Sequence, residues 1–252
     1  MAIWKDKLRA AGIHLGLSLL VAALAAALVF GVWYPYPYRE ISGGRALFVL
    51  LVAVDVVMGP LLTLVVFNRA KPWREKLLDF SVIGALQLAA LGYGLWTVAQ
   101  ARPVHLVFAY DRFTVAHAAE VAPEALPAAP PGLRRLPWTG PSVIGLRPLA
   151  GQERFDVTMA ELSGVPAASR PELWRDYDSV REAVRAAARP AAELSQRFAD
   201  RSADIARVLQ GTRRAATDLA YVPLAAPKGQ FWTVIIDRQS ADVLAFLPLD
   251  SF

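Results

Sequence analysis

Asp55 places an ionisable side chain inside an apolar run, DVVMGPLLTLVVF, that also contains Gly59 and Pro60. An ionised carboxylate near the centre of a bilayer costs about 2.5–3.5 kcal/mol, so we expect it to be protonated or paired within a bundle. Pro60 cannot donate a hydrogen bond to the Val56 carbonyl, which predicts a bend one turn past Asp55. Gly59 and Thr63, at i+4 and i+8, extend a small and polar stripe along one helix face.

Three interpretations of this stripe follow. Gln87, at about the same depth in the next apolar segment, could hydrogen-bond Asp55 inside a compact bundle. Alternatively, the stripe is a docking surface for another membrane helix, with Asp55, Gly59, Pro60, Thr63 and Gln87 as candidate partner-binding residues. A proton or ion relay is the third possibility, but relays need a chain of ionisable groups. His14 lies about 16 Å from the depth of Asp55, too far for direct contact.

Other residues that could carry catalysis lack the spacing that catalysis requires. His105 and His117 are twelve positions apart with no HExxH, so we expect ordinary strand residues near a surface. There is no cysteine, no GxSxG elbow and no glycine-rich phosphate loop. Glu75 and Asp79 could form a carboxylate pair, but the basic residues around them favour a salt-bridged helix start. We therefore expect no enzyme activity, no catalytic residue, no metal and no cofactor.

Three segments are long and apolar enough to cross a bilayer, which takes about 20 residues. They are 11–33, 46–67 and 80–101. The first has an apolar run longer than the roughly 7–15 residues of a signal-peptide core, so we expect an uncleaved anchor. The predicted fold class is a membrane protein: three transmembrane α-helices in a membrane domain, 1–101, followed by a small extracytoplasmic α+β domain, 102–252.

The basic residues predict the orientation. Seven of them flank one side of the spans, Lys5, Lys7, Arg9, Arg69, Lys71, Arg74 and Lys76, against Arg39 and Arg45 in the other short loop. By the positive-inside rule, the N-terminus is cytoplasmic and the C-terminal domain lies outside the cytoplasm. Residues 1–101 hold nine basic and five acidic side chains and the remainder eighteen and seventeen, so the net charge of +5 belongs mainly to the membrane half. We therefore expect no nucleic-acid partner.

The outer domain is predicted to hold two helices packed on an antiparallel sheet. Residues 103–121 indicate two strands around Tyr110-Asp111-Arg112, and FWTVIID with VLAFLPL indicates a closing hairpin. Seven prolines predict an irregular excursion over 122–149. A capping-box pattern at 169–172 predicts a helix that Pro190 ends, and a second helix carries Leu194, Phe198, Ile205 and Leu209 up to Gly211.

Several strings of the chain resemble the TfpX/TfpZ kind of type IV pilin accessory proteins. They are AGIHLGLSLLVAALAAALVFGVWYPYPY, DVVMGPLLTLVVFN and QLAALGYGLWTVAQARPVHLVFAYDRFTV, with a closing FLPLD. Beside Asp55, Gly59, Pro60 and Thr63, the motif positions are Asn68, Gln100, Arg102, Pro103, Asp111, Arg112 and Phe113, whose role the resemblance leaves unknown.

The resemblance implies a non-enzymatic protein of the bacterial inner membrane, with a periplasmic domain, that binds a major type IV pilin. Its implied role is chaperone-like: to support pilin stability, presentation or assembly into pili. The lipid bilayer and the pilin are the implied partners, with no small-molecule substrate. An envelope scaffold or ligand sensor without catalytic activity is the alternative, and the short cytoplasmic segment 68–79 leaves no room for a signalling domain.

Overall fold

A computed structural model describes residues 2–68 and 70–252. The chain divides between Ala101 and Arg102 into a helical unit and an outer α+β unit, each with its own internal contacts. Arg69, used above for orientation, lies outside the described residues.

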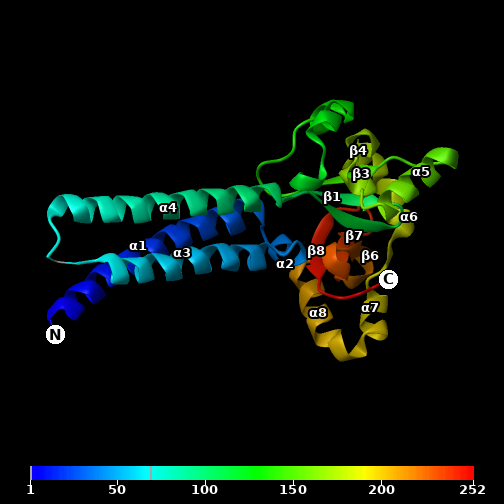
Figure 1. The fold of residues 1–252 in the computed structure, drawn as a ribbon. Helices are drawn as coiled ribbons and strands as arrows, with labels where there is room; N and C mark the ends of the chain where they lie inside the picture. Colours follow the sequence, from blue (N-terminus) through cyan, green and yellow to red (C-terminus); the bar gives the residue numbers. More distant parts are fainter. Residues whose placement is uncertain (1, 69) are drawn as a thin grey trace. The chain divides into compact units, whose positions relative to one another are not determined.

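Three long helices form the helical unit (Figure 1). They are α1 (Ala2–Leu28), continued by the π-helical turn η1 (Val29–Trp33), α3 (Gly44–Val66) and α4 (Trp73–Gln100), with the short α2 (Tyr38–Ile41) between η1 and α3. All three are long and apolar enough to cross a membrane. The first and third begin several residues before the predicted spans, because their charged N-terminal flanks are helical as well. Gly43, just before α3, has φ of 69°, a left-handed conformation that favours glycine.

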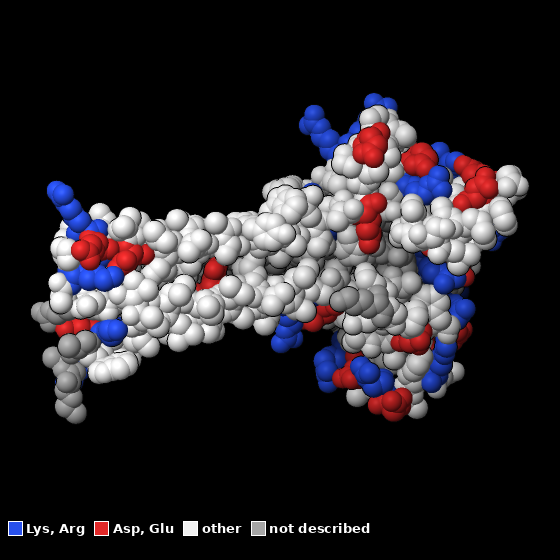
Figure 2. Space-filling model, viewed as in Figure 1, with Lys and Arg blue, Asp and Glu red and all other residues white. Residues whose placement is uncertain are grey.

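The two ends of the helical unit are chemically different. At one end, an aromatic and aliphatic cluster joins all three helices, and the Tyr34 hydroxyl donates to the Val98 carbonyl at 3.2 Å. At the other end, Lys7 Nζ donates to the Val65 carbonyl at 3.4 Å, and Lys71 pairs with Asp79 at 2.6 Å. Figure 2 shows charged side chains gathered at that end and an uncharged surface along most of the helices. The N-terminal basic residues therefore share one end of the bundle with those of the α3–α4 loop.

The outer unit is built on an eight-stranded sheet in the order β4-β3-β1-β2-β6-β7-β8, with β5 paired to β6. The strands are β1 (Pro103–Ala109), β2 (Arg112–His117), β3 (Ser142–Leu146), β4 (Trp174–Asp176), β5 (Arg189–Pro190), β6 (Leu219–Ala225), β7 (Phe231–Asp237) and β8 (Val243–Leu247). The helices are α5 (Gly151–Leu162), α6 (Arg181–Ala187), α7 (Ala192–Arg197) and α8 (Ser202–Gly211). Short 3-10 turns link them: η2 (Ala118–Glu120), η3 (Pro123–Ala128), η4 (Pro131–Leu133), η5 (Ala167–Ser169), η6 (Pro171–Leu173), η7 (Tyr177–Val180), η8 (Ala199–Arg201), η9 (Ala216–Asp218) and η10 (Pro227–Gly229).

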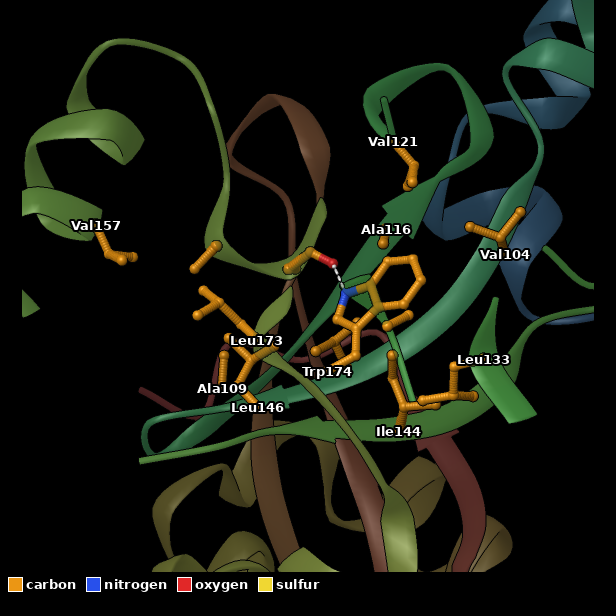
Figure 3. Close-up of a cluster of buried hydrophobic side chains, with 14 residues drawn as sticks. Val104, Ala109, Ala116, Val121, Leu133, Ile144, Leu146, Val157, Leu173 and Trp174 are labelled. Atoms are coloured by element: carbon orange, nitrogen blue, oxygen red, sulfur yellow. Dashed lines mark hydrogen bonds between the residues drawn. The ribbon is translucent and has the colours of Figure 1, made fainter. Parts of the chain in front are cut away.

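Among the described residues, two apolar clusters pack against this sheet. One surrounds Trp174, which is fully buried and donates its indole N–H to the Ala168 carbonyl at 2.8 Å (Figure 3). The other packs α7 and α8 against β6, β7 and β8, with Leu194 and Ile205 at its centre. Burying the indole while its N–H stays bonded avoids the cost of an unsatisfied donor.

The sheet is mixed rather than antiparallel as predicted, because β1 pairs with β3 and β2 with β6 in parallel. Both predicted hairpins, β1–β2 and β7–β8, are present. The first predicted helix is wrong: after Pro171 the chain forms 3-10 turns and strand β4 before the short α6. The second is split at Phe198, whose φ of −126° and ψ of 64° are not helical.

Candidate functional site

A chain of hydrogen-bonding groups joins α1, α3 and α4 inside the helical unit. His14 Nδ1 lies 2.5 Å from Thr63 Oγ1, and His14 Nε2 lies 2.7 Å from Gln87 Oε1. Gln87 Nε2 in turn donates to the main-chain carbonyl of Asp55 at 3.2 Å. Each of the three long helices therefore contributes at least one polar group to a single network in an apolar setting.

The donors and acceptors fix the direction of this network. Gln87 Oε1 can only accept, so His14 Nε2 donates to it; in the neutral imidazole Nδ1 then accepts from the Thr63 hydroxyl. One of the three interpretations was a hydrogen bond between Gln87 and Asp55. Gln87 does bond Asp55, but at the main-chain carbonyl rather than at the carboxylate. That carbonyl lies one residue before the Val56 carbonyl, which Pro60 leaves without its helical donor.

Two of the candidate docking residues are used inside the bundle. A Cβ at Gly59 would overlap the Gln87 carboxamide, so a larger residue would displace this group from its bond to the Asp55 carbonyl. Thr63 is fully buried and bonded to His14. Pro60 is half-buried on the same helix. The predicted stripe on α3 is therefore largely an internal packing face, and Asp55 of this stripe and Gln87 of α4 line a cavity.

The sequence interpretation left His14 out of this site. His14 was expected to lie too far from Asp55 for direct contact; the side chain of Gln87 bonds both His14 and the main-chain carbonyl of Asp55. The sequence could have indicated His14, because it shares one face of α1 with Ser18 and Ala22 and polar residues in a span usually face a partner.

Asp55 lines a cavity of about 280 Å³ to which α1, α3 and α4 all contribute residues. Within residues 2–68 and 70–252, no hydrogen bond or ion pair reaches the Asp55 carboxylate. We call this hollow the α1–α4 groove; its walls and floor include Leu17 and Val21 of α1, Val52 and Asp55 of α3, and Gly84 and Leu88 of α4. A second cavity, of about 320 Å³, shares His14, Leu17 and Gly84 with the first and extends it to Ala10 and Phe80.

The remaining motif positions lie at turns and in the outer unit. Asn68 Oδ1 accepts from the Ala70 N–H at 3.0 Å, which closes the turn after α3, and Gln100 is exposed at the end of α4. Arg102 is buried, donates to the Pro137 carbonyl and stacks on Trp138 at 4.7 Å. Pro103 begins β1.

Phe113 is fully buried and packs against Phe108, so its role is in the core. Asp111 and Arg112 form a 2.8 Å ion pair at the exposed β1–β2 turn. Their side chains line an open hollow of about 560 Å³ with Arg154 and Glu161 of α5. Opposite charges face each other across this hollow, so it favours no one class of charged ligand.

His105 and His117 were expected near a surface, and both are buried instead. His105 Nδ1 and Ser142 Oγ are hydrogen-bonded at 2.8 Å, and the imidazole packs edge-on against Trp174. Burial lowers the pKa of His105 to about 4. His117 contacts Glu120 at 3.3 Å, and hydrogen bonds from His117 help to lower the pKa of the Glu120 carboxyl. Among the described residues, no three His, Asp or Glu side chains gather as metal ligands would.

These features define a membrane-spanning protein of three helices with a mixed-sheet α+β domain. The comparisons with known proteins agree with that class. The chain is 35% identical over 243 residues to "Fimbrial assembly protein, serogroup I" of Dichelobacter nodosus, covering 96% of this chain and 94% of the relative. The serogroup E1 protein of the same organism matches with the same identity and coverage. The protein of serogroups C1 and C2 is 45% identical over 118 residues, which are 47% of this chain and 90% of the relative.

The family model "Fimbrial assembly protein FimB" matches residues 2–43, which include α1, η1 and α2. No solved structure is significantly similar to the chain. The chain belongs to the fimbrial assembly protein family.

Proposed function

We propose that this chain is a non-enzymatic accessory protein of the bacterial inner membrane that binds a type IV pilin and supports its stability, presentation or assembly into pili. The observation that carries the proposal is end-to-end similarity to proteins named for fimbrial assembly, across both the helical and the outer unit. Because the similarity covers both units, the shared role draws on the membrane helices as well as on the outer domain.

The orientation is part of the proposal. The basic residues of the α1 start and of the α3–α4 loop share one end of the bundle, and such residues remain in the cytoplasm. Three spans then carry the outer unit to the periplasm. A protein built in this way is placed to meet a membrane-anchored pilin subunit with its helices and with its outer domain.

Co-purification tests the proposal. The full chain, affinity-tagged and extracted in mild detergent from cells that make the cognate pilin, is expected to retain that pilin, and cells lacking the chain are expected to lose most surface pili. A tagged three-span inner-membrane protein of another family, made at the same level, serves as the control. Equal recovery of pilin with the control, together with normal piliation without the chain, would refute the proposal.

A further inference from the structure

The unpaired Asp55 carboxylate decides what can occupy the α1–α4 groove. Lipid tails offer no hydrogen-bond donor. A groove filled by them would leave the carboxylate desolvated and without a hydrogen-bond partner, which is costly in hydrocarbon. An occupant that brings an ammonium, amide or hydroxyl donor to the same depth removes that cost. His14, Ser18 and Gln87 also line this cavity, and His14 and Gln87 are already bonded to each other. The Asp55 carboxylate therefore favours a partner that is apolar along most of its length and carries a donor at this depth.

The dimensions of the groove fit a helix. The two cavities share three lining residues, and together their linings extend from Ala10 to Ala22 on α1 and from Phe80 to Leu91 on α4. At 1.5 Å per residue these stretches are about 17 Å long, more than half of the roughly 30 Å hydrocarbon core. Gly84 lies in this groove with no atom near the position of a Cβ, and small residues allow a second helix to approach closely.

The internal network keeps the groove in shape. His14 and Gln87 bridge α1 and α4 across its floor, while both residues also bond to α3. This network uses Gln87, Thr63 and the Asp55 carbonyl, so the carboxylate of Asp55 is left to the groove. At this depth the hydrogen-bond network therefore holds the bundle together, and the Asp55 carboxylate is available to a partner.

We propose that the α1–α4 groove receives one apolar spanning helix of the partner, with a hydrogen-bond donor of that helix on the Asp55 carboxylate. This rests on the proposed function for the identity of the partner, a membrane-anchored pilin. The groove thereby recognises a helix by one donor at a defined depth and excludes helices that are apolar throughout.

Photo-cross-linking in cells tests the groove. A photo-reactive benzoyl-phenylalanine is placed in the full chain at Leu17 or Leu88, which line the groove and are 59% and 68% exposed. The matched controls are Leu24 and Leu86 on the same two helices, 65% and 62% exposed but outside the groove lining. We expect pilin adducts from the groove positions at roughly tenfold the yield from the controls.

The Asp55 variants test the carboxylate, with the level of the chain in membranes confirming that each variant folds. Asp55→Leu is expected to lower the adduct yield from Leu88 by about tenfold, and Asp55→Asn, which keeps an acceptor oxygen, by less. An unchanged yield with Asp55→Leu overturns the proposal. Equal adduct yields from groove and control positions also overturn the proposal. If pilin still co-purifies in that case, the proposed function is unaffected. Adducts only with a second copy of this chain, or with no protein at all, also overturn the proposal. If co-purification fails as well, the proposed function is also wrong.

Discussion

His105 makes the stability of the outer unit depend on pH. Its ring is 1% exposed, its Nδ1 contacts Ser142, and its Nε2 has no hydrogen-bond partner among the described residues. Burial therefore lowers its pKa from 6.5 to about 4. Between these values the unfolded chain binds a proton that the folded chain does not, so the free energy of unfolding falls as the pH drops.

The expected magnitude follows from the two pKa values. From pH 7.5 to pH 5 the neutral ring costs the folded state about 2 kcal/mol, at about 1.4 kcal/mol per pKa unit. For a unit of this size that corresponds to a fall of about 4–8 °C in the melting temperature. The pKa values of Asp237 and Glu120 are lowered from 3.8 and 4.5, so the stabilisation by these two carboxylates is lost mainly below about pH 5 and contributes little over this range.

His105→Phe separates the histidine from those carboxyls. Phenylalanine keeps an aromatic ring edge-on to Trp174 but has no titrating nitrogen. The free energy of unfolding of the outer unit is measured in the detergent-solubilised chain at both pH values. Between these values it should fall by about 2 kcal/mol more in the wild type than in the variant. Equal losses in the two proteins would show that burial does not hold His105 neutral, and the argument would be wrong.

Three further substitutions probe the packing. Gly59→Ala should destabilise the helical unit by about 1–3 kcal/mol in detergent unfolding, because its Cβ displaces Gln87. The control Gly16→Ala meets open space and should be close to neutral, and similar effects of the two substitutions would contradict the close approach of Gln87 to Gly59. Ile205→Ala should cost about 2–5 kcal/mol in thermal unfolding, since the side chain is 1% exposed, and a cost under 1 kcal/mol would contradict its place in the core. Arg181→Ala should lower the free energy of unfolding by at most about 1 kcal/mol, because its ion pair with Asp242 in the β7–β8 turn is partly exposed. A larger loss in the same thermal unfolding would show that the contacts of Arg181 with this turn stabilise the unit more than an exposed ion pair does.

The membrane helices were predictable because bilayer thickness imposes a length and a composition that the sequence displays directly. The hairpins were predictable for the same kind of reason, since alternating apolar residues bounded by turns are a local pattern. The residues that follow Pro171 show where local patterns fail: their apolar spacing fits a helix, but Trp174 to Asp176 pair with β3, and this long-range pairing decides the conformation.

Helix α5 was missed for a related reason. It buries Val157 alone, while Phe155, Met159 and Leu162 are exposed, so no core-facing pattern marks it in the sequence. In the candidate site, the sequence identified Asp55 and Gln87 as neighbours in depth. It could not assign the Gln87 bond to a carbonyl or bring His14 into the network, because both depend on how three helices pack around one long side chain.

The account rests most directly on the outer unit and the α3–α4 loop lying on opposite sides of the membrane. The chain has no cysteine, so single substitutions at exposed positions, Thr217→Cys in the outer unit and Arg74→Cys at the start of α4, report on topology without background. A membrane-impermeant maleimide applied to intact spheroplasts should label Thr217→Cys at once and Arg74→Cys only after lysis. Labelling of Arg74→Cys in intact spheroplasts, with Thr217→Cys protected, would contradict the account.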